Sequence, residues 1–173
     1  MSSIKGIIFD YGGTIDTDGI HWGEFIWEQY KETGVDISHE TYREAYVHGE
    51  RFLAKNHVIE PTDTFHTLLR KKIAIHFDYL NNRFPEKHFS KEDAERIADG
   101  CYNKVKKTME TTCAVVKELS KQYPLVLVTN FYGNMPVVLK EFNLSEYFKT
   151  IVESSVVELR KPDPALFALG VEA

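Results

Sequence analysis

The sequence has few cysteines and no excess of basic residues, and both shortages limit what the protein can do. Its only cysteines, Cys101 and Cys113, have neither a paired motif nor the density of a disulfide-stabilised domain, so we predict that both are reduced. Acidic residues outnumber basic ones, and the net charge is −5. This balance leaves no basic surface of the kind that binds nucleic acid.

Long apolar runs and low-complexity segments are also missing. No run approaches the roughly 18–20 apolar residues of a membrane span. The first residues lack the basic region and apolar stretch of a signal peptide. We therefore expect a cytoplasmic protein with no membrane partner. Hydrophobic residues make up 43% of the 173 residues, enough for one domain, or for one domain that carries an insertion.

An apolar run over residues 4–9 leads directly into Asp10 and then into a glycine pair. Such a run is typical of a buried strand in a parallel sheet, and Gly12 and Gly13 favour a tight turn. Asp10 is therefore predicted at the carboxyl end of the first strand, where open α/β sheets bind ligands. Its carboxylate could act there as a nucleophile or metal ligand, or could simply cap the turn.

The pattern from residue 19 to residue 107 is helical, with no strand. Helices are predicted over residues 20–33, after Ser38, after Asp63, and from Ser90 to Cys101. This block is too long for an ordinary crossover between strands. We predict an inserted all-helical cap beside the sheet, joined through a polar hinge at residues 16–19; the alternative is that these helices only cover one sheet face.

The rest of the chain returns to alternating helices and strands. Helices are predicted over residues 111–122, 135–141 and 165–169, and strands over 125–130 and 148–152. Right-handed crossovers make these strands parallel, so their carboxyl ends meet at one edge of the sheet. The pattern therefore predicts an α/β fold with a parallel sheet.

Polar residues follow the predicted strands at that edge. Thr129 and Asn130 end the second strand, and Lys161 lies in the loop after the third. A hydroxyl, an amide and an ammonium around the Asp10 carboxylate suit an anionic substrate such as a phosphoryl group. Taken singly, Thr129 could be a strand-terminal cap and Lys161 a solvated surface lysine.

Three motifs in this order resemble those of the haloacid dehalogenase-like (HAD) hydrolase superfamily. Residues 9–14 (FDYGGT) resemble its strand-terminal Asp-x-Asp-Gly-Thr, residues 126–130 (VLVTN) its strand that ends in Thr or Ser, and residues 161–164 (KPDP) its lysine followed by proline. The resemblance implies a Rossmann-like three-layer core over residues 1–18 and 108–173. It also implies a helical cap over residues 19–107.

The resemblance implies a phosphatase that acts on a small phosphorylated metabolite through an aspartyl-phosphate intermediate. Asp10 would attack the phosphoryl group, and Lys161 would offset the charge beside it. Mg²⁺ would be held by the Asp10 carboxylate and the backbone carbonyl of Gly12. The implied substrate-binding residues are Gly13, Thr14, Thr129 and Asn130.

Gly12 departs from the family pattern. Phosphatases of the family usually carry a second aspartate there, which is the general acid and base. Such proton transfer is typically worth about 10²–10⁴-fold in rate. Asp16 could substitute for it through the turn, and otherwise we expect low activity or a substrate with a good leaving group.

The family's fourth motif, a strand followed by Gly-Asp and a further acid, has no counterpart in this sequence. Without those acids we expect only a weak or incomplete Mg²⁺ site. We also expect a core that is truncated at the C-terminus, with the first strand as an exposed edge. A homodimer that pairs through this edge is an alternative.

Two other functions remain open. A 2-haloacid dehalogenase has the same fold, lacks the second aspartate and needs no metal. Its first motif, however, has Tyr-Gly-Thr after Asp-x, whereas Tyr11 follows Asp10 directly here. It also needs a cap arginine, for which Arg43 and Arg51 are the candidates. The third alternative is a truncated inactive remnant that binds a ligand without turnover.

Overall fold

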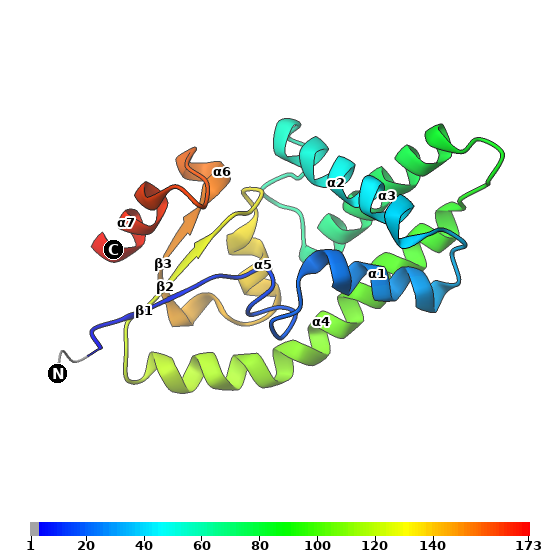
Figure 1. Cartoon of the computed structure of the whole chain (residues 1–173). Helices are drawn as coiled ribbons and strands as arrows, with labels where there is room; N and C mark the ends of the chain where they lie inside the picture. The colour runs from blue at the N-terminus through cyan, green and yellow to red at the C-terminus, as the bar shows by residue number, and fades with distance from the viewer. Residues whose placement is uncertain (1–3) are drawn as a thin grey trace.

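A computed structural model describes residues 4–173 and contains a parallel sheet of three strands in the order β1-β2-β3 (Figure 1). The strands are β1 (Ile7–Phe9), β2 (Leu125–Thr129) and β3 (Phe148–Glu153). Both pairings are parallel, so all three strands end at the same edge. The predicted α/β class with a parallel sheet is confirmed. Residues 1–3 of the predicted core lie outside the described residues.

The central strand β2 is buried along its whole length, as expected for a strand covered on both faces. The outer strand β1 is shorter than the predicted run over residues 4–9. Its pairing begins with Ile7 opposite Leu125, directly after Pro124. Proline has no N–H to donate, so the ladder does not extend further back. Ile8, in the middle of β1, remains 39% exposed.

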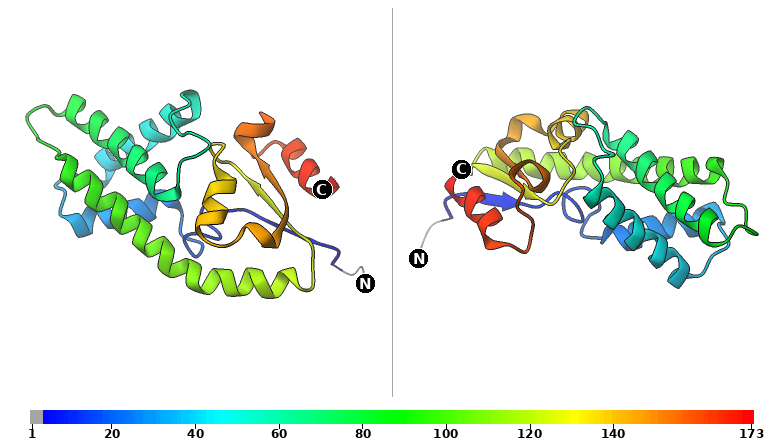
Figure 2. Two further views of the ribbon diagram at one scale, coloured as in Figure 1. Left: turned by 180° about the vertical axis from the view of Figure 1, so that it is seen from behind. Right: turned by 90° about the horizontal axis from the view of Figure 1, so that it is seen from above.

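Helices cover both faces of the sheet, which gives three layers (Figure 2). The first face packs against α5 (Met135–Glu141) and the C-terminal half of α4 (Lys91–Ser120). The opposite face packs against α7 (Pro164–Glu172), where Leu166 lies among Val126, Val128 and Val152. The predicted three-layer arrangement is therefore confirmed. Two short elements, η1 (Ser145–Tyr147) and α6 (Ser154–Val157), flank β3.

Beyond the end of the sheet that carries Asp10 lies a helical part, formed by three helices and the N-terminal half of α4 (Figure 1). These helices are α1 (Trp22–Thr33), α2 (His39–Lys55) and α3 (Phe65–Arg83). The described residues from 19 to 107 include no strand, as predicted. No helix within residues 4–173 combines the length and hydrophobicity that a membrane crossing requires.

The helix starts follow their capping residues, with one correction. Ser38 and Ser90 accept hydrogen bonds from backbone N–H groups in the first turns of α2 and α4, as predicted. The prediction that Asp63 caps α3 is wrong. Thr64 is the cap, while the Asp63 carboxylate accepts from the Glu60 N–H and pairs with Lys71.

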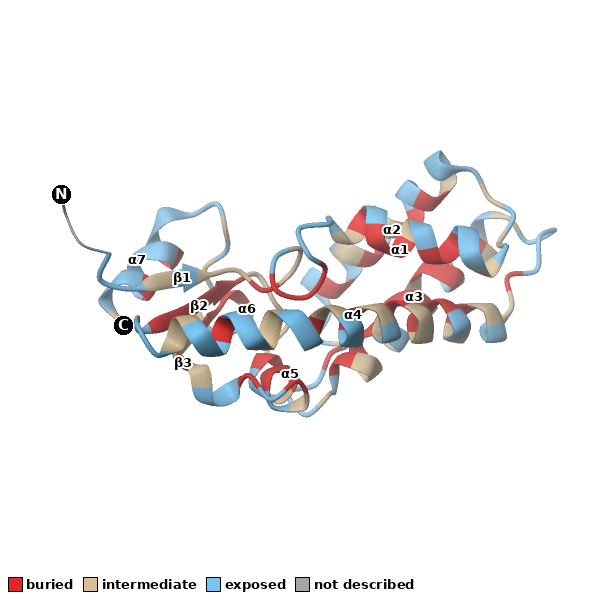
Figure 3. Ribbon diagram, turned by 90° about the horizontal axis from the view of Figure 1, so that it is seen from below, coloured by how far each residue is buried: buried red, intermediate tan, exposed pale blue. Residues whose placement is uncertain are grey.

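The two helices predicted on either side of residue 107 are one continuous helix, α4. Its buried positions Cys101, Val105 and Met109 repeat every four residues, so one apolar face continues past the expected break. Figure 3 views the molecule from below, where the mostly exposed outer side of α4 runs past both the sheet and the helical part. The predicted domain boundary at residue 107 therefore falls inside a helix.

Candidate active site

Asp10 and Lys161 form an ion pair at the carboxyl edge of the sheet. Asp10 follows the last residue of β1, and its Oδ1 accepts a hydrogen bond from the N–H of Tyr11 at 2.8 Å. Its Oδ2 lies 2.6 Å from Nζ of Lys161, in the loop before α7. The same ammonium donates to the carbonyl of Val128 in β2 at 3.1 Å. Lys161 therefore links the ends of β1 and β2.

Asn130 holds the backbone of Lys161 from the end of β2. Its Oδ1 accepts from the Lys161 N–H at 2.9 Å, and its Nδ2 donates to the Lys161 carbonyl at 3.3 Å. Both ends of the amide side chain are thus occupied by one peptide backbone. Asn130 was expected to bind substrate, but its contacts in this structure position the lysine.

Thr129, the last residue of β2, is fully buried. Its hydroxyl oxygen has no hydrogen-bond partner among the described residues. Buried polar groups in proteins are nearly always hydrogen-bonded, and those that are not usually have a ligand, water or functional role. The Thr129 hydroxyl therefore has unused hydrogen-bonding capacity at the end of β2.

The turn after Asp10 uses most of its N–H groups internally. Gly13 adopts a φ of 79°, which favours glycine, and its N–H donates to Oδ1 of Asp16 at 2.8 Å. The N–H of Thr14 donates to the carbonyl of Tyr11 at 3.1 Å. Gly13 and Thr14 were expected to donate to phosphoryl oxygens, whereas in this structure their N–H groups already have acceptors.

Asp16 joins the turn to the first helix. It is fully buried, and its second oxygen accepts a hydrogen bond from Nε1 of Trp22 at 2.8 Å. Burial raises the pKa of Asp16 to about 7, against the hydrogen bonds from Trp22 and Gly13, which lower it. Both carboxylate oxygens are engaged, so Asp16 fixes Trp22 against the turn. These contacts do not direct it toward the Asp10 carboxylate.

A cavity of about 220 Å³ opens between the sheet edge and the helical part. We call it the interface cavity. Gly12, Gly13 and Asn130 line it from the strand ends, and Arg160 from the loop before Lys161. The helical part contributes His21, Trp22, Tyr46, Glu50 and Lys72, and Tyr132 follows β2. Asp10, Thr129 and Lys161 do not line it, but Thr129 and Lys161 are each next in sequence to a lining residue, and Asp10 is two residues before Gly12.

Sequence reasoning missed Glu50 and Lys72 as cavity residues. The available signal was Lys72, a charged residue on the otherwise apolar face of α3 between Leu69 and Ile73, which is only 5% exposed. A buried lysine in such a stripe requires a partner. Its partner is Glu50 of α2, whose Oε1 lies 2.7 Å from Lys72 Nζ.

The chain's whole described length matches one protein family. A family model described as haloacid dehalogenase-like hydrolase covers residues 4–173. The chain belongs to the haloacid dehalogenase-like hydrolase family. A search of curated proteins found no match to this chain. Among solved structures it is similar to the HAD-hydrolase YfnB from Bacillus subtilis, described as bound to magnesium, with 13% identity and a TM-score of 0.49. That similarity covers 96% of this chain and 71% of YfnB.

The donor set for a metal in this HAD-like hydrolase is small. Among residues 4–173, no three His, Cys, Asp or Glu side chains cluster closely enough to hold a metal ion. The Asp10 carboxylate is 40% exposed and can still accept a ligand on its open side. Mg²⁺ is commonly held by one or two carboxylates together with phosphate oxygens and waters. Asp10 therefore fits a Mg²⁺ ion that is completed by a bound phosphate.

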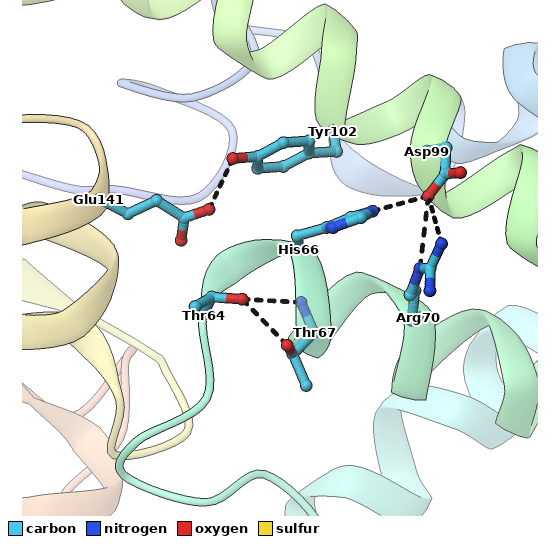
Figure 4. Close-up of polar contacts among 7 residues, drawn as sticks. All are labelled: Thr64, His66, Thr67, Arg70, Asp99, Tyr102 and Glu141. Atoms are coloured by element: carbon cyan, nitrogen blue, oxygen red, sulfur yellow. Dashed lines mark hydrogen bonds and ion pairs between the residues drawn. The ribbon is translucent and has the colours of Figure 1, made fainter.

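A second polar cluster fastens the helical part to the sheet part (Figure 4). Glu141, at the end of α5, accepts from the Tyr102 hydroxyl at 2.7 Å and from the Phe65 N–H at 2.6 Å. The Tyr102 ring stacks on His66, whose Nε2 lies 2.6 Å from Oδ1 of Asp99. One carboxylate of the sheet part thus contacts both α3 and α4, and one of these contacts is to Phe65, which lines the interface cavity.

Proposed function

We propose that this HAD-like hydrolase is a phosphatase that acts on a small phosphorylated metabolite through an aspartyl-phosphate on Asp10. The observation that carries the proposal is the 2.6 Å contact between Asp10 Oδ2 and Lys161 Nζ at the carboxyl edge of the sheet. Thr129, at the end of the adjacent strand β2, supports the same function, because its hydroxyl has no partner among the described residues and suits a phosphoryl oxygen.

In the proposed reaction an Asp10 carboxylate oxygen attacks phosphorus, and the bond from phosphorus to the leaving oxygen breaks. Water then attacks the aspartyl-phosphate, which releases phosphate and restores the carboxylate. Lys161 offsets negative charge in both steps, and Thr129 holds a phosphoryl oxygen. Asp10 and the Gly12 carbonyl would hold Mg²⁺, which would supply further charge stabilisation when bound.

Among the described residues, the proposed site lacks a side chain that could transfer a proton to the leaving group. Gly12 has no side chain to protonate the leaving group, and both oxygens of Asp16 are engaged by Gly13 and Trp22. The leaving oxygen would take its proton from water. We therefore expect slow turnover and a preference for substrates with good leaving groups.

The proposed division of the molecule assigns residues 4–18 and 108–173 to the catalytic core and residues 19–107 to a cap. The interface cavity between them supports this division, because it adjoins the Asp10 turn on one side and the helices α1, α2 and α3 on the other. In the proposal, the phosphoryl group binds at the sheet edge and the rest of the substrate binds in this cavity.

The test is hydrolysis of p-nitrophenyl phosphate by the purified chain with and without Mg²⁺. The proposal predicts phosphate release that requires Mg²⁺ and is lost in Asp10→Asn. Folded protein that releases no phosphate under any metal condition would contradict it and favour an inactive remnant that binds without turnover.

Gly12 also favours a second candidate, a 2-haloacid dehalogenase, since that activity needs no acid at this position. Its required cap arginine is missing from the interface cavity. Arg43 and Arg51 instead line a groove on the outer side of α2 with Tyr79. Metal-independent halide release from 2-chloropropionate, without phosphatase activity, would support the dehalogenase over the phosphatase.

A further inference from the structure

The Glu50–Lys72 ion pair lies in the wall of the interface cavity, on the side that the helical part forms. Glu50 comes from α2 and Lys72 from α3. The Lys72 side chain is 7% exposed and that of Glu50 is 30% exposed, so the carboxylate is the more open member of the pair. The mechanism proposed for the sheet edge uses neither residue.

Both members of the pair are charged. Burial alone would raise the pKa of Glu50, but the adjacent Lys72 ammonium outweighs it and holds that pKa below its usual range. Burial alone would lower the pKa of Lys72, but the Glu50 carboxylate raises it above its usual value. The Glu50–Lys72 pair therefore presents one positive and one negative group with no net charge of its own. Arg160 adds a positive charge to the same cavity from the loop before Lys161.

Glu50 and Lys72 can each form further hydrogen bonds. Glu50 Oε1 meets Lys72 at 2.7 Å and Oε2 accepts from the Tyr132 hydroxyl at 3.2 Å, which leaves carboxylate lone pairs free. Lys72 Nζ pairs with Glu50 and lies over two aromatic rings, 5.2 Å from the ring centre of Tyr132 and 6.0 Å from that of Trp22. Aromatic faces attract the charge but leave N–H groups open to a ligand oxygen.

This combination selects a particular kind of ligand group. A hydroxyl both donates and accepts, so it can satisfy Glu50 and Lys72 at once. A carboxylate or a second phosphate would be attracted by Lys72 but repelled by Glu50. An ammonium would be attracted by Glu50 but repelled by Lys72. The volume of about 220 Å³ lies below the 300–1,000 Å³ typical of sites for drug-sized ligands, which indicates a group of a few carbons.

We propose that the Glu50–Lys72 pair makes the interface cavity a subsite for an uncharged, hydroxyl-bearing leaving group of a few carbons. This inference rests on the phosphatase function proposed above and specifies its substrate class. Glu50 accepts from the hydroxyl and Lys72 donates to it, while Trp22, Tyr46 and Tyr132 exclude water around them. The pair rejects leaving groups that carry a carboxylate.

Two three-carbon phosphomonoesters test this directly, because they differ only in the group opposite the phosphate. Glycerol 1-phosphate ends in a hydroxymethyl group and 3-phosphoglycerate in a carboxylate. Binding of each is measured by calorimetry with Mg²⁺ to the full chain carrying Asp10→Asn, in which no turnover is expected. The expected result is that glycerol 1-phosphate binds about tenfold or more tightly than 3-phosphoglycerate.

Glu50→Gln then removes the repulsion while Lys72 stays charged. The ratio should shift by about tenfold or more toward 3-phosphoglycerate. Glu44→Gln, the same exchange on the exposed side of α2, should leave it unchanged. A second variant, Glu50→Leu with Lys72→Met, removes the buried pair as a unit and should abolish the preference. It keeps the test informative if the single variant does not fold.

Two results overturn the inference: equal or tighter binding of 3-phosphoglycerate to the parent chain, or a ratio that Glu50→Gln does not change. Failure to bind either ester also counts against it. Failure of the phosphatase function is seen separately, as absence of p-nitrophenyl phosphate hydrolysis by the chain with Asp10 intact. The binding ratio is measured whether or not that activity exists.

Discussion

The ammonium of Lys161 lies 2.6 Å from the Asp10 carboxylate and is tied at 3.1 Å to the Val128 carbonyl, so it is held between two strand ends. Two hydrogen bonds from Asn130 to the Lys161 backbone fix the same loop. The charge beside the proposed nucleophile is thus positioned before any substrate arrives. Such preorganisation is what makes electrostatic stabilisation effective in catalysis.

Replacing this lysine should therefore remove activity without unfolding the protein. Lys161→Met is expected to lower kcat for p-nitrophenyl phosphate by about 10²–10³-fold, the range for losing one preorganised charge or donor. Steady-state kinetics and circular dichroism on the same samples provide the measurement. Lys149→Met, on an exposed position of β3, should keep normal kcat. Equal rates for the two variants would contradict the assigned role.

Restoring the family's second aspartate should increase turnover. Gly12 does not have a positive φ, and a Cβ there would meet Cδ1 of Trp22 at 3.7 Å, an ordinary contact. Gly12→Asp should therefore fold and raise kcat by about 10²–10⁴-fold, the usual worth of general acid–base catalysis. Gly12→Asn has the same shape but cannot transfer the proton, so it should show no gain. A folded Gly12→Asp variant with unchanged kcat would disprove the prediction.

Asp16 should make stability depend on pH. Its pKa in the folded protein is about 7, above the value near 3.9 of an unfolded chain, so the folded state binds the proton more tightly. Its contribution to the free energy of unfolding is thus full below about pH 4 and is lost as pH rises toward 7. The three-unit difference corresponds to about 4 kcal/mol. Relative to the parent, Asp16→Asn should gain stability by up to this amount over that range.

The comparison must be made as a difference between proteins, because His76 acts in the opposite direction. Burial lowers the pKa of His76 to about 3, so its contribution is present above about pH 6.5 and lost as pH falls. The two effects partly cancel in the parent. Urea unfolding of the parent and Asp16→Asn from pH 4 to 8 isolates Asp16. A difference that stays constant with pH would contradict its raised pKa.

Gly49 should be needed for the packing of α2 against α3. A Cβ at this position would lie 2.6 Å from Cδ2 and 2.7 Å from Nε2 of His76, whose ring is fully buried. Gly49→Ala should lower the free energy of unfolding by roughly 1–3 kcal/mol, the usual cost of overpacking. Arg43→Ala, on the exposed side of the helix, should stay within about 0.5 kcal/mol. Thermal unfolding with no loss in Gly49→Ala would show that the ring can move.

The sequence was most informative where local chemistry decides the structure. The buried strand Leu125–Thr129 and the helix Met135–Glu141 were predicted within a residue. The strand is an apolar run that begins directly after Pro124. Ser38 marks its helix start in the same way. The unbroken α4 was not predicted, because its continuity depends on Val105 and Met109 packing against other elements.

The same distinction applies to the candidate site. Strand-end placement predicted that Asp10, Thr129 and Lys161 would gather at one edge. It could not predict that the Asn130 amide serves the Lys161 backbone, since an amide there suits a ligand equally well. Nor could it pair Glu50 with Lys72, because their contact depends on how two helices pack, which no local pattern encodes.

The central claim is that Asp10 becomes phosphorylated, and mass spectrometry of the intact protein tests it most directly. Because Gly12 supplies no base for the attacking water, the aspartyl-phosphate should break down slowly and accumulate. Protein quenched in acid during p-nitrophenyl phosphate turnover with Mg²⁺ should carry one phosphoryl group, located on Asp10 by peptide sequencing and removed by hydroxylamine. An Asp10→Asn sample should carry none. Phosphate release with no adduct on Asp10, or an adduct that persists in Asp10→Asn, would contradict the account.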